Sequence, residues 1–335
     1  GLLTTSAFAD EEVTYEHPSD INSVVDIMKN YAFIGFNEVD MNGHQHINLL
    51  VNKVVGLPGD MGIRKNYAGV YEYYVNKLPE NISGELKIGE NDPCVSNLTI
   101  GSDYTISTNG SERYIEPNHV KVSPSVTNIK AETATNKYID LVNLQNSFIS
   151  YSAMLAENAD STEGFGFEGQ YDSSSHTWQN INRINVTAES GTVFYNIDDT
   201  NFSKINSDAI INFSDTSTAS IVLNIDLKNI SWDRKPFRLN IGGNQPTMNE
   251  DVILEDNVNR IYYNFYDSSA ADKMTTKTVS MTDAAHGTII IPKGAAKVGS
   301  NWCGVIVANN IGATGESHFV GAYNPVVPAS ATVDV

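Results

Sequence analysis

The feature that most constrains the fold is a series of short apolar segments, each closed by glycine, asparagine, aspartate or proline. From residue 183 onward they include "RINVTA", "GTVFYNI", "SIVLNIDL", "RIYYNFY", "GTIIIP" and "GVIVANN". Corners that accept left-handed backbone angles suit a chain that turns after every short strand. The segments are almost continuously apolar, as parallel strands covered on both faces are. The pattern predicts mainly β structure in an irregular β-solenoid (β-helix). The competing two-layer sandwich would show cleaner alternation and asparagine-glycine hairpins.

Two segments depart from this pattern of short strands and turns, and they predict helices. Residues 134–157 contain no glycine or proline, and their apolar side chains recur at helical spacing. The predicted buried face consists of Tyr138, Leu141, Val142, Gln145, Phe148, Ile149, Ser152 and Leu155. Residues 18–32 predict a short N-terminal helix that begins near Ser19 and Asp20. We expect the long helix to pack along the solenoid, because its apolar face needs a large apolar surface.

Charge and the chain ends predict an exported protein. The formal net charge is -19 and 18% of residues are charged, so nucleic acid and anionic membranes are unfavourable partners. Residues 1–9 resemble a signal-peptide remnant, because Ala7-Phe8-Ala9 precedes an acidic start. No apolar run is long enough to insert in a membrane. We expect one domain over 10–325 and a linker to a stalk or anchor over 326–335.

Candidate metal and redox sites are few. Cys94 and Cys303 lie 209 positions apart, and two buried, unpaired thiols are favoured over a disulfide. His44 and His46 alternate on a strand as two metal ligands would, but a third ligand is not evident nearby. We therefore favour the interpretation that His44 and His46 are two polar side chains on a solvent-exposed face. We expect no cofactor.

The order of segments from about residue 30 to 325 resembles a known family, most specifically over 191–225 and 261–318. The segments "GTVFYNIDDTNFSKINSDAIINFSDTSTASIVLNID", "RIYYNFYDSS", "GTIIIPKGAAKV" and "WCGVIVANNIGATGESH" are similar in order and pattern to motifs of the choice-of-anchor A family. "YAFIGFNEVDMNGHQHINLLVNKVVG" is similar to its opening strand pair. The resemblance implies an exported adhesive module of bacterial surface proteins, with a solenoid fold and no enzymatic activity. It also places Ile289–Ile291 and Val305–Val307 in adjacent coils, with Gly304, Gly312 and Gly315 at corners.

Several acidic and polar motifs invite a catalytic interpretation that their spacing does not favour. Glu316-Ser317-His318 are consecutive, so an extended chain would split them between two faces, and a hydrogen-bonded cap on the last coil is favoured over a hydrolase site. Asp198-Asp199 and Glu255-Asp256 are adjacent pairs, whereas glycoside hydrolysis needs two separated carboxylates across a cleft. These loops leave a calcium site open as an alternative.

Clustered tyrosines are the candidates for ligand binding. Tyr71 and Tyr73 form one cluster, and Tyr262 and Tyr266 belong to a second. Tyrosines that alternation leaves outside the core suit a sugar- or peptide-binding patch. We therefore expect a secreted, cell-surface adhesin module, monomeric within a longer protein, that binds a host protein, a matrix protein or a glycan. The alternative is a secreted polysaccharide lyase or hydrolase. Ice binding would need a flat Thr-x-Thr ladder, which the sequence does not show.

Overall fold

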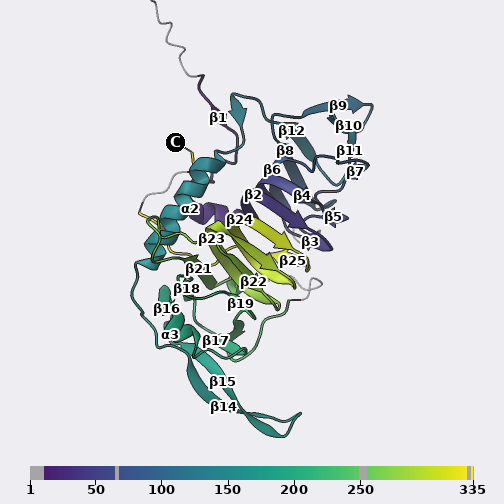
Figure 1. The fold of residues 1–335 in the computed structure, drawn as a ribbon. Helices are drawn as coiled ribbons and strands as arrows, with labels where there is room; N and C mark the ends of the chain where they lie inside the picture. The colour runs from purple at the N-terminus through teal and green to yellow at the C-terminus, as the bar shows by residue number, and fades with distance from the viewer. Residues whose placement is uncertain (1–10, 65–67, 249–254, 330–332, 335) are drawn as a thin grey trace, which may run out of the picture.

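The chain folds mainly into parallel β strands, as the computed structural model shows for residues 11–64, 68–248, 255–329 and 333–334 (Figure 1). Its largest sheet has 15 strands, all paired in parallel. Ten of them follow one another across the sheet in the order β12 (Asn128–Ala131), β8 (Cys94–Ile100), β6 (Gly69–Lys77), β4 (Leu49–Gly56), β2 (Phe33–Met41), β24 (Trp302–Ala313), β23 (Ala285–Val298), β21 (Ile261–Tyr266), β18 (Ser220–Asp226) and β16 (Thr192–Ile197).

The sheet bends around corners, so that successive strands form coils with three sides. In β2 the register shifts between Gly35 and Glu38, and in β23 it shifts between Ile291 and Ala295. The part of the strand after each shift lies on a second side. Shorter strands complete the second and third sides: β19 (Asp233–Arg234), β22 (Thr278–Met281), β25 (Ser317–Phe319), β3 (His44–His46) and β5 (Asp60–Met61). This succession of parallel coils is consistent with the predicted β-helix and not with a two-layer sandwich.

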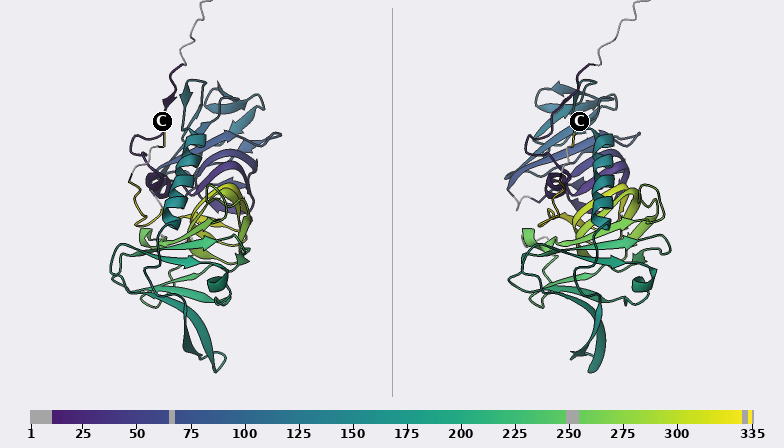
Figure 2. Two further views of the ribbon diagram at one scale, coloured as in Figure 1. Left: turned by 60° about the vertical axis from the view of Figure 1, so that its left-hand side comes forward. Right: turned by 90° about the vertical axis from the view of Figure 1, so that its left-hand side faces the viewer.

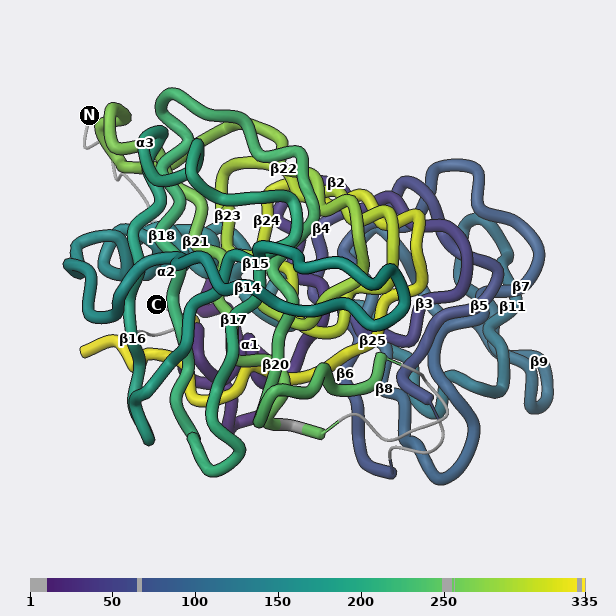
Figure 3. Tube along the Cα trace, turned by 90° about the horizontal axis from the view of Figure 1, so that it is seen from below, coloured from purple at the N-terminus to yellow at the C-terminus, as the bar shows by residue number. Residues whose placement is uncertain are grey.

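The coils do not follow one another in sequence order. The C-terminal strand β24 pairs directly with the N-terminal strand β2. On the third side, β25 lies between β24 and β3. One coil is therefore formed by two distant parts of the chain: β25 supplies one side, and β2 supplies the other two. Figure 3 shows the result as a stack whose colours pass from green through yellow to purple and blue. Two distant parts of the chain therefore form a continuous solenoid.

Helix α2 (Leu141–Ala156) runs along the outside of this stack (Figure 2). It begins seven residues later than the predicted range 134–157, because Asp140 caps it by accepting a hydrogen bond from the backbone N–H of Asn143 at 3.0 Å. The predicted buried face is also rotated. Val142 is 72% exposed, while Leu144 and Tyr151, which the prediction left out, are buried beside Phe148.

Polar side chains fix α2 to the sheet beneath it. Ser152 Oγ donates to Asn264 Oδ1 at 2.6 Å. Asn264 Nδ2 donates to Asn224 Oδ1 at 2.9 Å, and Asn224 Nδ2 donates to the Leu155 carbonyl at 2.8 Å. All four residues are buried, so the network satisfies polar groups that would otherwise be costly to desolvate.

The N-terminal helix α1 (Val24–Asn30) is shorter than the predicted range 18–32. Ser23 caps it in a capping box with Asp26, whereas Ser19 and Asp20 belong to the preceding turn. Two further short helices occur in the described residues, α3 (Asp199–Phe202) and the 3₁₀ helix η1 (Asp256–Val258).

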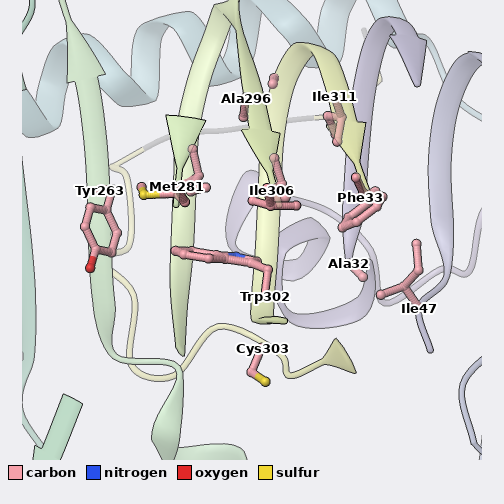
Figure 4. Close-up of a cluster of buried hydrophobic side chains, with 14 of the residues drawn as sticks. Ala32, Phe33, Ile47, Tyr263, Met281, Ala296, Trp302, Cys303, Ile306 and Ile311 are labelled. Atoms are coloured by element: carbon pink, nitrogen blue, oxygen red, sulfur yellow. The ribbon is translucent and has the colours of Figure 1, made fainter. Parts of the chain in front are cut away.

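Inside the coils, apolar side chains from neighbouring turns stack on one another. Ile289 pairs with Ile306 and Ile306 pairs with Phe33, which confirms that Ile289–Ile291 and Val305–Val307 occupy adjacent coils. Trp302 lies in the same core, 1% exposed (Figure 4). Strands β23 and β24, of 14 and 12 residues, are longer than the short segments expected, because each passes through a corner without losing its pairing.

Two of the three predicted corner glycines lie within a strand instead. Gly304 and Gly312 belong to β24, and only Gly315 lies in a turn. A Cβ on Gly304 would come within 1.8 Å of the Gly287 carbonyl oxygen on the adjacent strand. Close approach of two backbones, and not a left-handed turn, requires glycine at position 304.

Smaller sheets surround the two ends of the stack. The two strands β1 (Thr14–Tyr15) and β13 (Asn136–Lys137) pair in parallel near the start of α2. One four-stranded sheet contains β7 (Glu85–Leu86), β11 (Val120–Val122), β10 (Glu112–Glu116) and β9 (Thr105–Asn109). The other contains β14 (Gly166–Asp172), β15 (Thr177–Val186), β17 (Ala209–Phe213) and β20 (Arg238–Ile241), and its first two strands project as a hairpin from the far end of the molecule (Figures 1 and 2).

The C-terminal residues lie against the body. The Ala322 backbone N–H donates to the Met28 carbonyl at 3.0 Å, and Tyr151 Oη donates to the Val326 carbonyl at 2.6 Å. Val333 is buried, and Asp334 pairs with His17. Part of the segment 326–335 that was expected to be a linker therefore packs on the domain.

Candidate binding surface

Two of the four tyrosines predicted to bind a ligand are buried in the core. Tyr73 and Tyr262 are each 1% exposed, and burial raises the pKa of both hydroxyl groups. Tyr73 Oη accepts a hydrogen bond from the Ile63 backbone N–H at 3.0 Å. Tyr262 Oη, on the side covered by α2, donates to the Tyr323 carbonyl at 2.6 Å. These two side chains hold the fold together, and their prediction as surface ligands was wrong.

The other two, Tyr71 and Tyr266, are half-buried and far apart. Tyr71 packs partly against the solenoid core, and burial together with Asp226 raises the pKa of Tyr266. Their strands, β6 and β21, are five steps apart in the sheet order, which corresponds to about 24 Å at the usual strand spacing. The four predicted tyrosines do not form one patch.

His44 and His46 point outward from β3, as the alternation predicts, but each pairs with a different carboxylate. His44 Nδ1 lies 2.6 Å from Asp60 Oδ1, and His46 Nε2 lies 2.5 Å from Glu316 Oε1. They border a polar cavity of about 220 Å³. Among the described residues no group of three histidine, cysteine or acidic side chains is arranged to hold a metal ion.

Glu316-Ser317-His318 joins the two parts of the chain. The Ser317 backbone N–H donates to Gln45 Oε1 at 3.2 Å, and the His318 ring stacks on His46 with ring centroids 5.1 Å apart. Because Ser317 is buried and consecutive side chains of β25 point to opposite faces, the three do not form a nucleophile and its base. The motif lies in the middle of the stack, between β24 and β3, so the prediction that it caps the last coil was wrong.

The acidic pairs begin short helices. Asp198 caps α3 by accepting from the Asn201 backbone N–H at 2.8 Å, and Asp199 Oδ1 accepts from the Thr200 backbone N–H at 3.0 Å. Glu255 precedes η1. The carboxylates of the first pair are therefore occupied with local backbone groups, and calcium binding there stays a prediction.

The cysteines do not form a disulfide in this structure. Cys94 and Cys303 are both buried, on strands β8 and β24, which lie on opposite sides of β2 in the sheet order. Burial raises the pKa of the Cys303 thiol to about 12 and also raises that of Cys94.

The outward face of the second side carries mixed polar side chains. One row across the coils consists of Ser280, Lys297, Gly312 and Asp40, which are register partners on β22, β23, β24 and β2. Lys297 and Asp40 are exposed, so charges of both signs interrupt this face. This row contains no threonine.

The exposed aromatic side chains gather on the β14–β15 hairpin. Within the described ranges, the exposed large aromatic residues are Trp178 at 75%, Phe167 at 61% and Tyr171 at 48%. The hairpin pairs in antiparallel register from Gly166 opposite Arg183 to Asp172 opposite Thr177. Most apolar surface of a folded domain is scattered, so three large rings on one projecting element indicate a contact surface.

The antiparallel register places all three rings on one face. Tyr171 lies directly opposite Trp178, and their ring centroids are 5.7 Å apart. Phe167 lies four residues before Tyr171, and Gly169 stands between them opposite Asn180. We define this set, Phe167, Gly169, Tyr171, Trp178 and Asn180, as the aromatic face of the hairpin.

The sequence contained a signal for this hairpin that our prediction did not use. The first short apolar segment predicted after the long helix begins at Arg183, so the prediction left out the two hairpin strands before that residue. The structure shows Asp172 closing the turn, where its Oδ1 accepts from the Ser174 backbone N–H at 2.9 Å. Such a turn between alternating segments is typical of a hairpin.

Comparison with known proteins adds a family and a distant structural likeness. Residues 25–319 match the profile of a family described as "Putative Ice-binding-like adhesive domain". A solved structure of an ice-binding protein with antifreeze activity, from an Arctic yeast, matches with a TM-score of 0.35 and 11% identity over 94% of this chain and 100% of the other. At this level the structural likeness carries no argument about function. The comparison with curated proteins finds no match.

Proposed function

Because this chain belongs to the ice-binding-like adhesive domain family, we propose that it is an extracellular adhesion module whose contact surface is the aromatic face of the β14–β15 hairpin. The family match covers most of the chain and supports an adhesive role at a cell surface. The finer assignment, a bacterial surface adhesin related to the choice-of-anchor A family, rests on the motifs quoted above from residues 191–318.

The exposure of Trp178 is the observation that carries this proposal. The other two tryptophans, Trp232 and Trp302, are each 1% exposed, whereas Trp178 is 75% exposed. Large aromatic side chains of this kind dominate the energy of contact surfaces. The hairpin also points away from the end of the body where β1 and the C-terminal residues lie (Figure 1). A segment joined at either end would leave the hairpin free to reach a partner.

The candidate catalytic groups support binding without catalysis. Ser317 and His318 are buried in the joint between β25 and β3, and Asp198 caps a helix. A polysaccharide lyase or hydrolase, the alternative, needs two working groups across a cleft. The mixed charges on the second side, including Lys297 and Asp40, do not support an ice-binding surface either.

Adhesion of protein-coated beads tests this function. We expect beads that carry the full chain to adhere to host cells or to extracellular matrix, and free protein to compete for the same sites. Many copies on a bead make weak single contacts measurable. The same preparation should release neither reducing sugar nor unsaturated product from polysaccharides. Polymer turnover that is abolished by replacing one carboxylate would establish the enzyme alternative, and beads that adhere to nothing would remove the adhesive function.

A further inference from the structure

We propose that the aromatic face of the hairpin binds a neutral glycan, with sugar rings stacked on Trp178 and Tyr171. The inference rests on the proposed adhesive function and names the chemistry of its ligand.

The indole of Trp178 lies over Gly169 on the neighbouring strand. A Cβ built on Gly169 would be 3.7 Å from Trp178 Cε3, which is ordinary van der Waals contact. The indole therefore packs over the backbone at Gly169, and most of the residue stays exposed to solvent, at 75%. The C–H bonds on one face of a pyranose carry partial positive charge, and the electron-rich face of an aromatic ring attracts them. The exposed rings of Trp178 and Tyr171 suit this contact.

Neighbouring groups orient the rings of Tyr171 and Trp178. His176 Nδ1 lies 3.3 Å from Tyr171 Oη, and Tyr171 in turn contacts Trp178. On the opposite face of the ribbon, Arg183 Nε lies 3.2 Å from Glu168 Oε2. The base of β15 continues into the body by pairing in parallel with β17. Rings that are already oriented lose little freedom when a ligand binds.

Charge decides between a neutral and a charged ligand. The aromatic face contains no charged side chain, because Glu168, Asp172 and Arg183 all belong to the opposite face. The net charge of -19 disfavours sulfated or uronic-acid glycans. A basic protein would be attracted by that charge, but the aromatic face offers no carboxylate to receive a cation. The amide of Asn180 suits a sugar hydroxyl, since it can both donate and accept a hydrogen bond.

The area of the face does not suit a second copy of the chain. A fully buried aromatic side chain covers about 150–250 Å². Three rings therefore supply roughly 450–750 Å², and stable interfaces bury about 800 Å² on each partner. Two or three sugar units need much less.

Fluorescence of Trp178 gives a direct test, because Trp232 and Trp302 are buried. The full chain is screened against an array of neutral glycans and against heparin. Neutral glycans that bind are then titrated as free oligosaccharides. We expect at least one to shift the emission to shorter wavelength and to protect the chain from acrylamide quenching. Heparin should do neither.

Two variants and one matched control make the test specific. Trp178→Ala should weaken glycan binding at least tenfold, and Gly169→Leu should weaken it by displacing the indole. Val142→Ala removes a side chain of similar exposure, 72%, from the outer side of α2, and should leave binding unchanged. Circular dichroism checks that each variant is folded.

Each other result overturns the proposal. If no neutral glycan binds, or if Trp178→Ala binds as the unchanged chain does, the glycan site is wrong. Trp178-dependent dimerisation in analytical ultracentrifugation would identify a second copy as the occupant. Trp178-dependent binding to polylysine would identify a cationic partner. Beads carrying Trp178→Ala that still adhere would leave the adhesive function standing and remove the hairpin from it.

Discussion

Replacing Phe148 with alanine should destabilise the domain strongly, because α2 is held by its contact with the sheet. Phe148 is 0% exposed and its ring centroid lies 6.1 Å from that of Phe36 on β2. Losing the burial of a phenylalanine ring costs about 2–3 kcal/mol. A residual cavity of about 40–80 Å³ adds about 1–2 kcal/mol at roughly 24 cal/mol per Å³. The expected loss in the free energy of unfolding is therefore about 3–5 kcal/mol.

Urea denaturation followed by circular dichroism measures this loss, with Val142→Ala as the control on the same helix. Val142 is 72% exposed, so its truncation should change the free energy of unfolding by no more than about 0.5 kcal/mol. An unchanged slope against urea in both variants would show that the same surface is exposed on unfolding. A loss below about 1 kcal/mol at Phe148, or equal losses at both positions, would show that α2 is not docked as described.

Three further outcomes follow from the core. Gly304→Ala should lower the midpoint of thermal unfolding markedly, since its Cβ would meet the Gly287 carbonyl oxygen, while Gly59→Ala, with open space around its Cβ, should not. Burial lowers the pKa of His286, so the unfolded state binds a proton first as the pH falls below about 6.5. Stability is then lost on acidification, and His286→Gln should flatten urea-derived stability between pH 5 and 7; an unchanged slope contradicts this. Cys303, buried with a pKa of about 12, should resist a thiol reagent at pH 8 in the native protein and react in denaturant; rapid native labelling at position 303 would count against its burial.

The sequence predicted those parts of the fold that local residue patterns determine. Short apolar segments with polar corners, such as Ile289–Ile291, predicted parallel strands in adjacent coils. The positions of the helix ends were less accurate, because a single capping residue decides them, as Asp140 and Ser23 do here. The buried face of α2 was predicted from apolar spacing alone. Polar pairing with Asn224 and Asn264 also orients the helix, and no local pattern on α2 reveals those partners.

The candidate site was harder to predict, because exposure depends on the layer in which a strand lies. Tyr73 and Tyr262 looked like members of a surface cluster, but the inside of a coil takes one face of each strand and α2 covers the other on this side. The same alternation in β14 and β15 gives the opposite result. No second layer covers the hairpin, so Tyr171 and Trp178 stay exposed.

The order of the coils also limits where a contact surface can form. Pairing of β24 with β2 joins residues about 270 positions apart, and the contact of Glu316 with His46 closes the same joint on another side. The strands in the middle of the stack therefore hold the two parts of the chain together. Helix α2 covers one side of these coils. On the side that α2 covers, both faces of each strand are buried, so large rings there stay in the core. The hairpin lies outside all of these contacts except at its base, where β15 pairs with β17. Its aromatic face can therefore vary to match a ligand at little cost to the fold, as projecting elements on a rigid scaffold commonly do.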